Sequence, residues 1–122
     1  MAFKKIAGPI RLVSGTNGAD VEMPLPPRPG ARMCKQAQYT LNIVSSGGAA
    51  PKLGFKLRHG PDGVVSKEIV NVASVAIPAD NVAMFDSGSA MLCDVLHPVP
   101  VVGGSATGDW VGVEIYEMRK PF

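Results

Sequence analysis

The stretch YTLNIVSSGGAAPKLGFKLRHGPDG, residues 39–63, decides the fold of this chain. Apolar and polar residues alternate in its first half, at residues 40–43, and again in its second half, at residues 53–57. An alternation with a period of two is typical of β-strands that bury one face. Small residues separate the two halves, and GPDG at residues 60–63 is a further turn signal. The stretch therefore predicts a β-hairpin, and it contains no catalytic motif.

The rest of the chain is also rich in strand signals. Runs of β-branched or alternating residues occur at 4–13, 21–23, 31–44, 64–65, 69–77, 91–96 and 110–118. With turn residues between the runs and no convincing helix, they predict an all-β fold, a β-sandwich or jelly-roll-like domain. The core should contain two alternating sets of side chains, Leu53, Phe55 and Leu57 with Val111, Val113 and Ile115.

Three sequence features predict where individual segments lie relative to the core and the sheet edges. Lys35 interrupts the apolar side of residues 31–44, so the first part of that strand should lie outside the core. Pro98 and Pro100 lack a backbone N–H, and we expect them to keep the continuation of residues 91–96 at a sheet edge. The glycine-rich residues 103–108 predict a loose loop.

The proline content divides the chain into two parts. Residues 24–30, PLPPRPG, favour an extended conformation and cannot form an interior strand. We therefore expect residues 1–30 to be an N-terminal arm with one edge strand and a proline-rich segment. Residues 31–122 should form the β-sandwich domain with a short C-terminal tail.

Composition indicates one soluble domain. Hydrophobic residues are 46% and charged residues 18% of the 122 residues, enough for one core. No apolar run approaches the roughly 18 residues that span a bilayer, and the start MAFKKIAGPIRLV lacks the uninterrupted apolar core of a signal peptide. We expect synthesis in the cytoplasm, no membrane contact, and free thiols at Cys34 and Cys93.

Motifs for an enzyme, a cofactor or a metal are not found in the sequence. The glycines at 103–109 are not followed by the Lys-Ser/Thr of a phosphate-binding loop, and His59 and His97 stand in no metal-binding pattern. The aspartates near turns lack the spacing of a calcium loop. The chain is therefore not expected to be an enzyme.

Charge is unevenly distributed along the sequence. The net charge is only +2, too low to indicate a nucleic-acid partner. Residues 1–60 nevertheless carry a balance of +7 and residues 61–122 a balance of −5. Either antiparallel strands from both halves neutralise each other locally, or a basic surface of one subunit meets an acidic surface of another.

Residues 41–63 and the C-terminus resemble the sequences of a known group of proteins. An alternating strand, a small-residue loop, a second alternating strand and His59-Gly60-Pro61-Asp62-Gly63 resemble a motif of small all-β virion proteins of tailed bacteriophages. The late strand at 110–116 and the ending Arg119-Lys120-Pro121-Phe122 are similar to such proteins as well. The resemblance implies a decoration or cement protein that binds the outer surface of a capsid and stabilises it. Its implied partners are the major capsid protein and further copies of the chain, as a homotrimer on the virion.

Extended ends are expected to make these contacts. Prolines lower the entropy that an arm loses on binding, so residues 21–30 are expected to lie along another subunit. Arg28 and Arg32 would bind carboxylates on the capsid, and Phe122 would be an apolar anchor. The expected contact residues are Arg11, Pro24, Pro26, Pro27, Arg28, Arg32, Lys120, Pro121 and Phe122. The alternative function is a carbohydrate-binding or lectin-like β-sandwich module, which needs an exposed aromatic ring.

Overall fold

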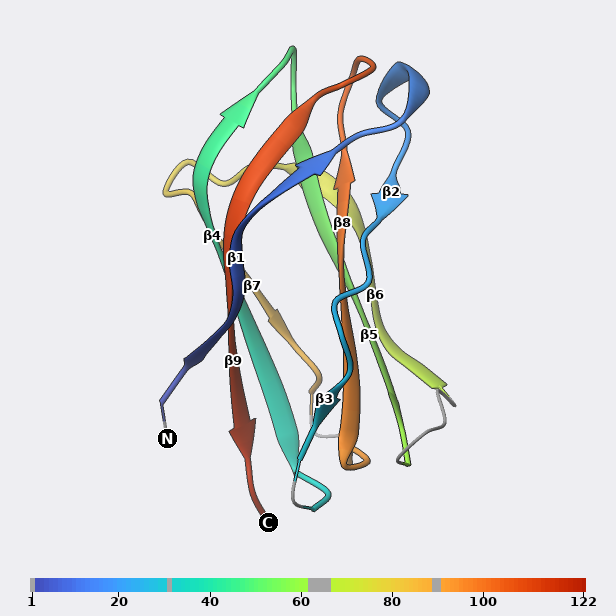
Figure 1. The fold of residues 1–122 in the computed structure, drawn as a ribbon, viewed down its shortest axis with the longest axis vertical. Helices are drawn as coiled ribbons and strands as arrows, with labels where there is room; N and C mark the ends of the chain where they lie inside the picture. The colour runs from blue at the N-terminus through green and yellow to red at the C-terminus, as the bar shows by residue number, and fades with distance from the viewer. Residues whose placement is uncertain (1, 31, 62–66, 89–90) are drawn as a thin grey trace.

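The computed structural model describes residues 2–30, 32–61, 67–88 and 91–122 (Figure 1). Within these ranges the chain consists almost entirely of strands. In order they are β1 Lys4–Val13, the short helical turn η1 Thr16–Gly18, β2 Val21–Glu22, β3 Arg28–Pro29, β4 Gln36–Gly47, β5 Lys52–Gly60, β6 Lys67–Ala76, β7 Val82–Asp86, β8 Val95–Gly103 and β9 Trp110–Lys120.

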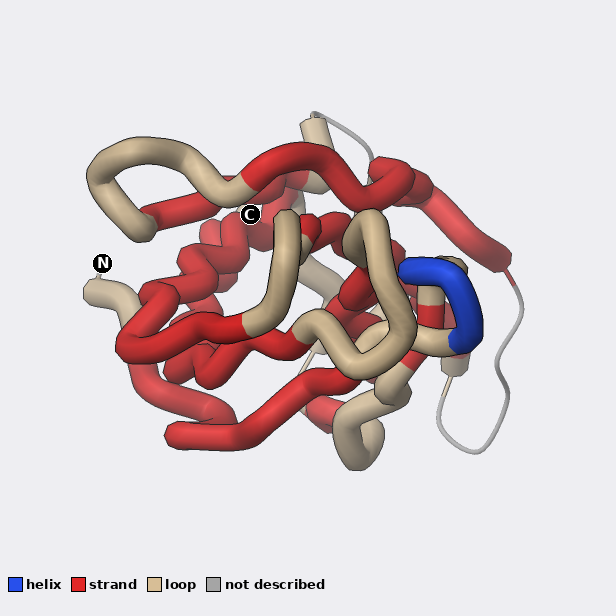
Figure 2. Tube along the Cα trace, turned by 90° about the horizontal axis from the view of Figure 1, so that it is seen from above, coloured by secondary structure: helices blue, strands red, loops and turns tan. Residues whose placement is uncertain are grey.

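The strands form two antiparallel sheets that pack on each other, so the predicted β-sandwich is confirmed. One sheet has four strands in the order β1-β9-β4-β7. The other has five, in the order β2-β8-β5-β6, with β3 also paired to β8. Loops and η1 cover the upper end of the sandwich (Figure 2). No helix of the described residues is long and apolar enough to cross a membrane.

The core contains the side chains that the alternation predicts. Phe55 is fully buried and lies between the rings of Tyr39 and Phe85, each with its centroid 5.0 Å away. Leu53 and Leu57 of β5 and Val111, Val113 and Ile115 of β9 are buried in the same cluster. Each sheet therefore contributes one alternating face to a shared interior.

The hairpin predicted for residues 39–63 is wrong. β4 pairs with β7 and β9, whereas β5 pairs with β6 and β8, so the chain crosses from one sheet to the other between them. Asp109 determines this crossing, because its carboxylate accepts the N–H groups of Ala49 at 2.8 Å and Ala50 at 3.2 Å. Gly48 has a φ of +103°, and a Cβ there would collide with the Asp109 carboxylate. Glycine is therefore required at this position.

The edge position predicted for Pro98 and Pro100 is also wrong. β8 contains both prolines and lies between β5 and the proline-rich arm. The carbonyl groups of Pro98 and Pro100 accept the N–H groups of Leu25 and Met23 of the arm, both at 3.0 Å. In an antiparallel strand the N–H and C=O of a residue lie on the same side, so the missing donors fall on the arm side. The ladder between β8 and β5 consequently loses no hydrogen bond to the prolines.

The first thirty residues contribute to both sheets. β1 is an edge strand, as expected, paired with β9 and irregular around Gly8 and Pro9. Residues 21–30 then run along β8 of the same chain. The strand expected from residue 31 begins at Gln36, and Cys34 before it forms an isolated bridge with Leu92. The predicted turn at 60–63 and the strand residues 64–65 lie partly or wholly outside the described residues.

Candidate functional site

The described residues do not form a metal centre. They contain no group of three or more His, Cys, Asp or Glu side chains that could hold a metal ion. His59, on β5, accepts the N–H of Cys93 at its Nδ1 at 3.0 Å. Partial burial, together with the charge of Lys67, lowers the pKa of His59. This histidine therefore helps to fix the segment before β8.

The acidic side chains are almost all bonded within the chain. The carboxylates that accept a hydrogen bond or an ion pair are those of Asp20, Glu22, Glu68, Asp80, Asp86, Asp109, Glu114 and Glu117. Among the described acids only Asp94 has a carboxylate without such a partner. Several pairs join the two halves of the sequence, such as Lys5 with Glu114 at 2.9 Å. These pairs neutralise part of the charge difference between the two halves.

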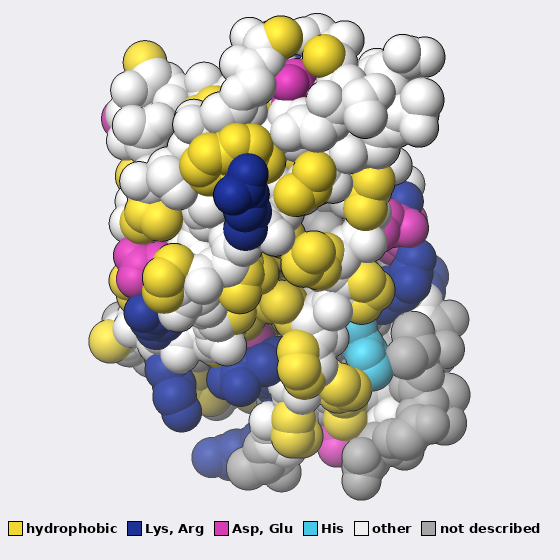
Figure 3. Space-filling model, turned by 45° about the horizontal axis from the view of Figure 1, so that its top comes forward, with side chains coloured by type: hydrophobic (Ala, Val, Ile, Leu, Met, Phe, Trp, Pro, Cys, Tyr) yellow, Lys and Arg dark blue, Asp and Glu magenta, His cyan; other side chains and the backbone are white. Residues whose placement is uncertain are grey.

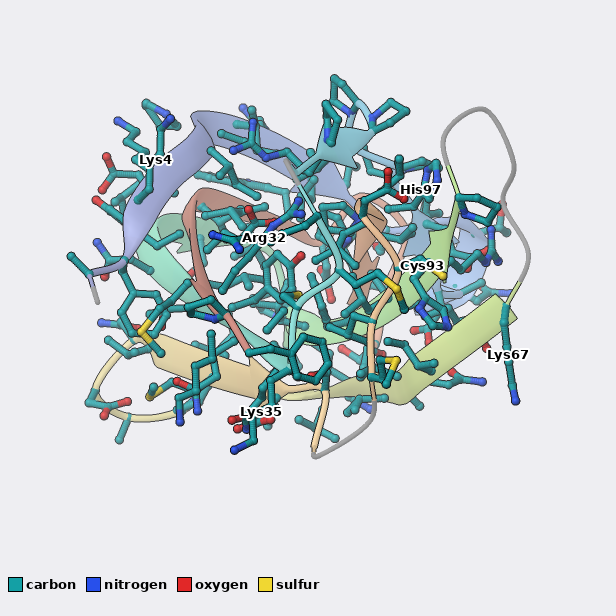
Figure 4. The ribbon with its side chains drawn as sticks, turned by 90° about the horizontal axis from the view of Figure 1, so that it is seen from below. Lys4, Arg32, Lys35, Lys67, Cys93 and His97 are labelled. Atoms are coloured by element: carbon teal, nitrogen blue, oxygen red, sulfur yellow. The ribbon has the colours of Figure 1, made fainter. Side chains whose placement is uncertain are left out.

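Several cations are left without an ion pair inside the described part of the chain. They are Lys4, Arg11, Arg32, Lys35, Lys52, Lys67 and Lys120. All except Arg11 and Lys52 lie at or near the lower end of the sandwich in Figure 1, where the chain also ends. Seen from below, Arg32 lies toward the middle of this end, with Lys4, Lys35 and Lys67 around it (Figure 4). The result is a concentration of positive charge on a chain whose net charge is small.

Exposed apolar side chains lie at the same end. Met33 is 41% exposed, Met91 59% and Phe122 72%. The bridge between Cys34 and Leu92 explains why Met33 and Met91 are exposed. The side chains of Cys34 and Leu92 point into the core, so the residues next to them in the chain point to the opposite side. We call the cations Lys4, Arg32, Lys35, Lys67 and Lys120, with Met33, Met91 and Phe122, the basic end. Figure 3 is turned so that the upper end comes forward, away from the basic end, and on its visible face cationic and apolar side chains also lie side by side.

Arg119 ties three chain segments together beneath the basic end. Its Nη1 donates to the Asp94 carbonyl at 3.1 Å, and its Nη2 donates to the Arg28 carbonyl. Its Nε donates to Glu117 Oε1 at 3.1 Å, and Glu117 is buried. A buried charge is tolerated when its partners satisfy it. The arm, the segment before β8 and the end of β9 are thus held as one unit.

The structure separates the residues expected to bind a partner into three groups. Arg32, Lys120, Pro121 and Phe122 lie at the basic end. Arg28 lies just above it, but its Nε is 3.8 Å from Glu117 Oε1 and its carbonyl accepts Arg119, so it serves the arm's attachment. Lys4, Lys35, Lys67, Met33 and Met91 were missed, and only the break that Lys35 makes in an apolar pattern hinted at any of them.

The arm prolines form a second group, along the edge of the five-stranded sheet. Met23 and Leu25 donate their N–H groups to β8, and Pro24 and Pro26, which alternate with them, have no N–H to offer outward. An edge without donors is a poor template for another strand. Pro24, Pro26 and Pro27 are exposed, so this edge presents proline rings to solvent.

Arg11 lies far from the other expected contact residues. Its guanidinium carbon is 4.1 Å from the centre of the Trp110 ring, at the start of β9, whereas Lys120 ends that strand. Ten residue steps of about 3.3 Å separate the two ends, roughly 33 Å. The Trp110 ring also covers Gly47, where a Cβ would come within 3 Å of three indole atoms. With Arg11 and Gly47 against its ring, Trp110 offers no open face for a sugar.

One cysteine, Cys34, forms the bridge that shapes the basic end, and Cys93 follows the other bridge residue. Cys34 is buried and Cys93 is partly exposed, and both thiols are free. Burial raises the pKa of the Cys34 thiol. Cys93 follows Leu92, the bridge partner of Cys34, and so lies on the other side of its segment. Cys93 lies toward the side of the end view, in the direction of His97 (Figure 4).

Comparison with known proteins gives no relative: no protein-family model, curated protein or solved structure matches this chain.

Proposed function

We propose that the chain is a structural virion protein of a tailed bacteriophage, which binds the outer surface of the capsid and stabilises it. The basic end is the docking surface in this proposal. One observation carries it: five of the seven cations that form no ion pair with the described residues lie, with exposed methionine and phenylalanine, at one end of the sandwich. The resemblance of residues 41–63 and the C-terminal tail to virion proteins supplies the kind of particle.

The composition of the basic end suits a protein partner. Interface centres are enriched in Met, Phe and Arg, and charges around them raise the rate of encounter with an oppositely charged surface. Met33, Met91 and Phe122 supply the apolar side chains, and Arg32 and Lys35 supply the charges. A capsid shell with acidic patches is the partner we assign, namely the major capsid protein.

A homotrimer remains part of the proposal. Three copies around an axis along the strands present three basic ends to one face of a particle, and multivalent attachment raises affinity without new contacts. Because the acids are bonded internally, such a trimer is held by uncharged surfaces. Mass photometry of the purified chain tests this part, and a monomer at micromolar concentration contradicts it.

Decoration of particles tests the function itself. Capsids that lack the protein, from the phage whose genome encodes it, are mixed with wild-type chain, with Arg32→Ala/Lys35→Ala or with Lys52→Ala. Lys52 is the matched control, because it also lacks an ion pair but pairs with Gly103 at the opposite end. We expect wild type and the control to sediment with capsids and the double variant to be lost from them. No occupancy by wild type refutes the function, and equal occupancy of all three refutes the basic end as its docking surface.

The carbohydrate-binding alternative gains no support from Trp110, whose ring lies between Arg11 and Gly47. We therefore do not propose it as a second function.

A further inference from the structure

We infer that the basic end binds an acidic segment of a different protein, in which carboxylates stand beside an apolar side chain. The inference rests on the proposed function and specifies the partner chemistry of the same surface. It depends on three observations. These are which charged side chains are already bonded within the chain (the charge accounting), the apolar side chains among the cations, and the contacts of Arg119 that hold the backbone beneath them (the fixed base).

The charge accounting of the described residues argues against a second copy as the occupant. To pair with the basic end, another copy would need unengaged carboxylates. Those of the described residues are bonded within the chain except Asp94, which belongs to the same end of the molecule. Breaking an internal pair such as that of Lys56 with Glu22, 3.0 Å apart, to form one between molecules gives no net gain. Among the described residues no patch of unengaged carboxylates complements the basic end, which favours another protein as the source of that charge.

The apolar side chains favour a protein over nucleic acid. Proteins bind a phosphate backbone through cations and polar donors, and they bind bases through stacked aromatic rings. The basic end offers one exposed ring, Phe122, and two exposed methionines, Met33 and Met91. Methionine is flexible and polarisable, and it suits irregular apolar protein surfaces. Carboxylates flanking a Leu- or Phe-like side chain satisfy both kinds of residue at once.

The fixed base lowers the ordering cost of binding. Arg119 joins the backbone at Arg28, the backbone at Asp94 and the Glu117 carboxylate. The segment that carries Arg32, Met33 and Lys35 begins close to this junction and is paired with Leu92 through Cys34. A surface already held in place loses less conformational entropy when a partner arrives.

A defined peptide probe tests the inference without any capsid. The full chain is titrated into a labelled peptide of repeated Glu-Glu-Leu triplets, and anisotropy is followed. Comparison probes are a Glu-Glu-Ser peptide of equal length, a Lys-Lys-Leu peptide and a short DNA duplex. The chain variants are Arg32→Glu/Lys35→Glu, Met33→Ser/Phe122→Ser and the control Lys52→Glu, each checked by thermal unfolding. Arg32, Met33, Lys35 and Phe122 are all exposed, so the fold should tolerate these changes.

We expect the Glu-Glu-Leu peptide to bind more tightly than every other probe. Reversing two charges should weaken it by about tenfold or more, since two attractive contacts are lost and replaced by repulsive ones. The Met33→Ser/Phe122→Ser variant should reduce the preference for Glu-Glu-Leu over Glu-Glu-Ser, and Lys52→Glu should behave as wild type. Tighter binding of the duplex, an equal loss with Lys52→Glu, or no binding of the acidic peptides overturns the inference.

The two proposals fail in different ways. If the peptide results hold but capsids are not decorated, the virion function is wrong and the partner chemistry stands. If capsids are decorated and Arg32→Glu/Lys35→Glu decorates them as wild type does, the decoration function stands and the inference is wrong.

Discussion

The Tyr39 hydroxyl donates a hydrogen bond to Glu117 Oε2 at 2.7 Å, and the two residues lie opposite each other on β4 and β9. Tyr39 is 1% exposed and Glu117 is 7% exposed. The other Glu117 oxygen accepts Arg119 Nε, and Arg119 in turn holds the backbone of the arm. This contact therefore joins the aromatic core to the base of the basic end.

Tyr39 gives the protein a specific sensitivity to alkali. Burial, followed by the charge of Glu117, raises the pKa of Tyr39 well above its usual value of 10.0. Above the usual value, Tyr39 of the unfolded chain releases a proton that Tyr39 of the folded state keeps. The free energy of unfolding therefore falls as pH rises, by roughly 1.4 kcal/mol per pH unit for one proton. We expect urea unfolding between neutral pH and pH about 11 to show this fall in wild type and a shallower one in Tyr39→Phe.

Tyr116 provides the control for this measurement. It lies on the same sheet, partly exposed on β9 and opposite Lys5 of the edge strand β1. Tyr116→Phe should retain the steep alkaline slope of wild type. Equal slopes for wild type and Tyr39→Phe would show that the buried hydroxyl does not govern this pH range.

The stacked ring of Phe55 should contribute strongly to stability. Phe55→Ala removes a fully buried side chain that contacts Tyr39 and Phe85, and it leaves a cavity between the sheets. We expect a loss of about 3–5 kcal/mol in the free energy of unfolding. Phe122→Ala removes a ring that is 72% exposed and should leave stability within about 0.5 kcal/mol. A small effect of Phe55→Ala on chemical unfolding would mean that the inner face of β5 is assigned wrongly.

The inner faces of the strands could be predicted from the sequence, but the pairing of the strands could not. Alternation is a local property, and it identified Leu53, Phe55 and Val113 as buried. Pairing depends on contacts that are distant in sequence. A loop of small residues can close a hairpin or cross between sheets, and here the Asp109 carboxylate, sixty residues from Ala49, decides for the crossing. The position of Pro98 in an interior strand likewise depends on the arm lying on the side that lacks a donor.

The candidate site was only partly predictable for a similar reason. Arg32 and Phe122 were expected to be at a partner surface because they lie in extended ends, and both are exposed. Lys4 and Lys67 reach the same end only through the registers of β1 with β9 and of β5 with β6. No pattern in the sequence shows which cations lack a partner, because that depends on which acids the fold places beside them.

Asp109 should be required for the loops at the upper end. Its carboxylate accepts the N–H groups of Ala49, Ala50, Ser105 and Ala106, and residues 103–108 are therefore an organised loop, not the loose one expected. These bonds lower the pKa of Asp109 below its usual 3.8. Asp109→Asn places an amide where donors converge, so it should lower the urea midpoint at neutral pH. The local Asp80, which accepts only the N–H of Val82, gives the control Asp80→Asn.

The pH dependence provides a second measurement on Asp109→Asn. A carboxyl whose folded pKa is depressed stabilises the protein above its unfolded pKa, and this stabilisation is lost as pH falls through the folded value. The wild type should therefore lose stability progressively below pH 3.8, and the variant should lack part of that loss. Asp86 and Glu114 have lowered pKa values too, so the difference between the two proteins is the quantity to measure. Parallel pH profiles would contradict the role given to Asp109.

Arg28→Ala and Arg32→Ala should affect different properties, although both residues were expected to bind a capsid. The first should lower stability and the second should reduce decoration. Arg28→Ala removes the guanidinium whose Nε lies 3.8 Å from the buried Glu117 carboxylate. The contact between the arm and this carboxylate is lost with it. We expect it to lower the free energy of unfolding by about 1 kcal/mol, a modest loss because Tyr39 and Arg119 still satisfy Glu117. Arg32→Ala should leave unfolding unchanged and reduce decoration, because Arg32 is exposed and forms no ion pair with the described residues. Thermal unfolding and capsid sedimentation of both variants separate the two roles. If Arg32→Ala unfolds earlier, or if Arg28→Ala alone abolishes decoration without a loss of stability, the division between an arm anchor and a docking residue is wrong.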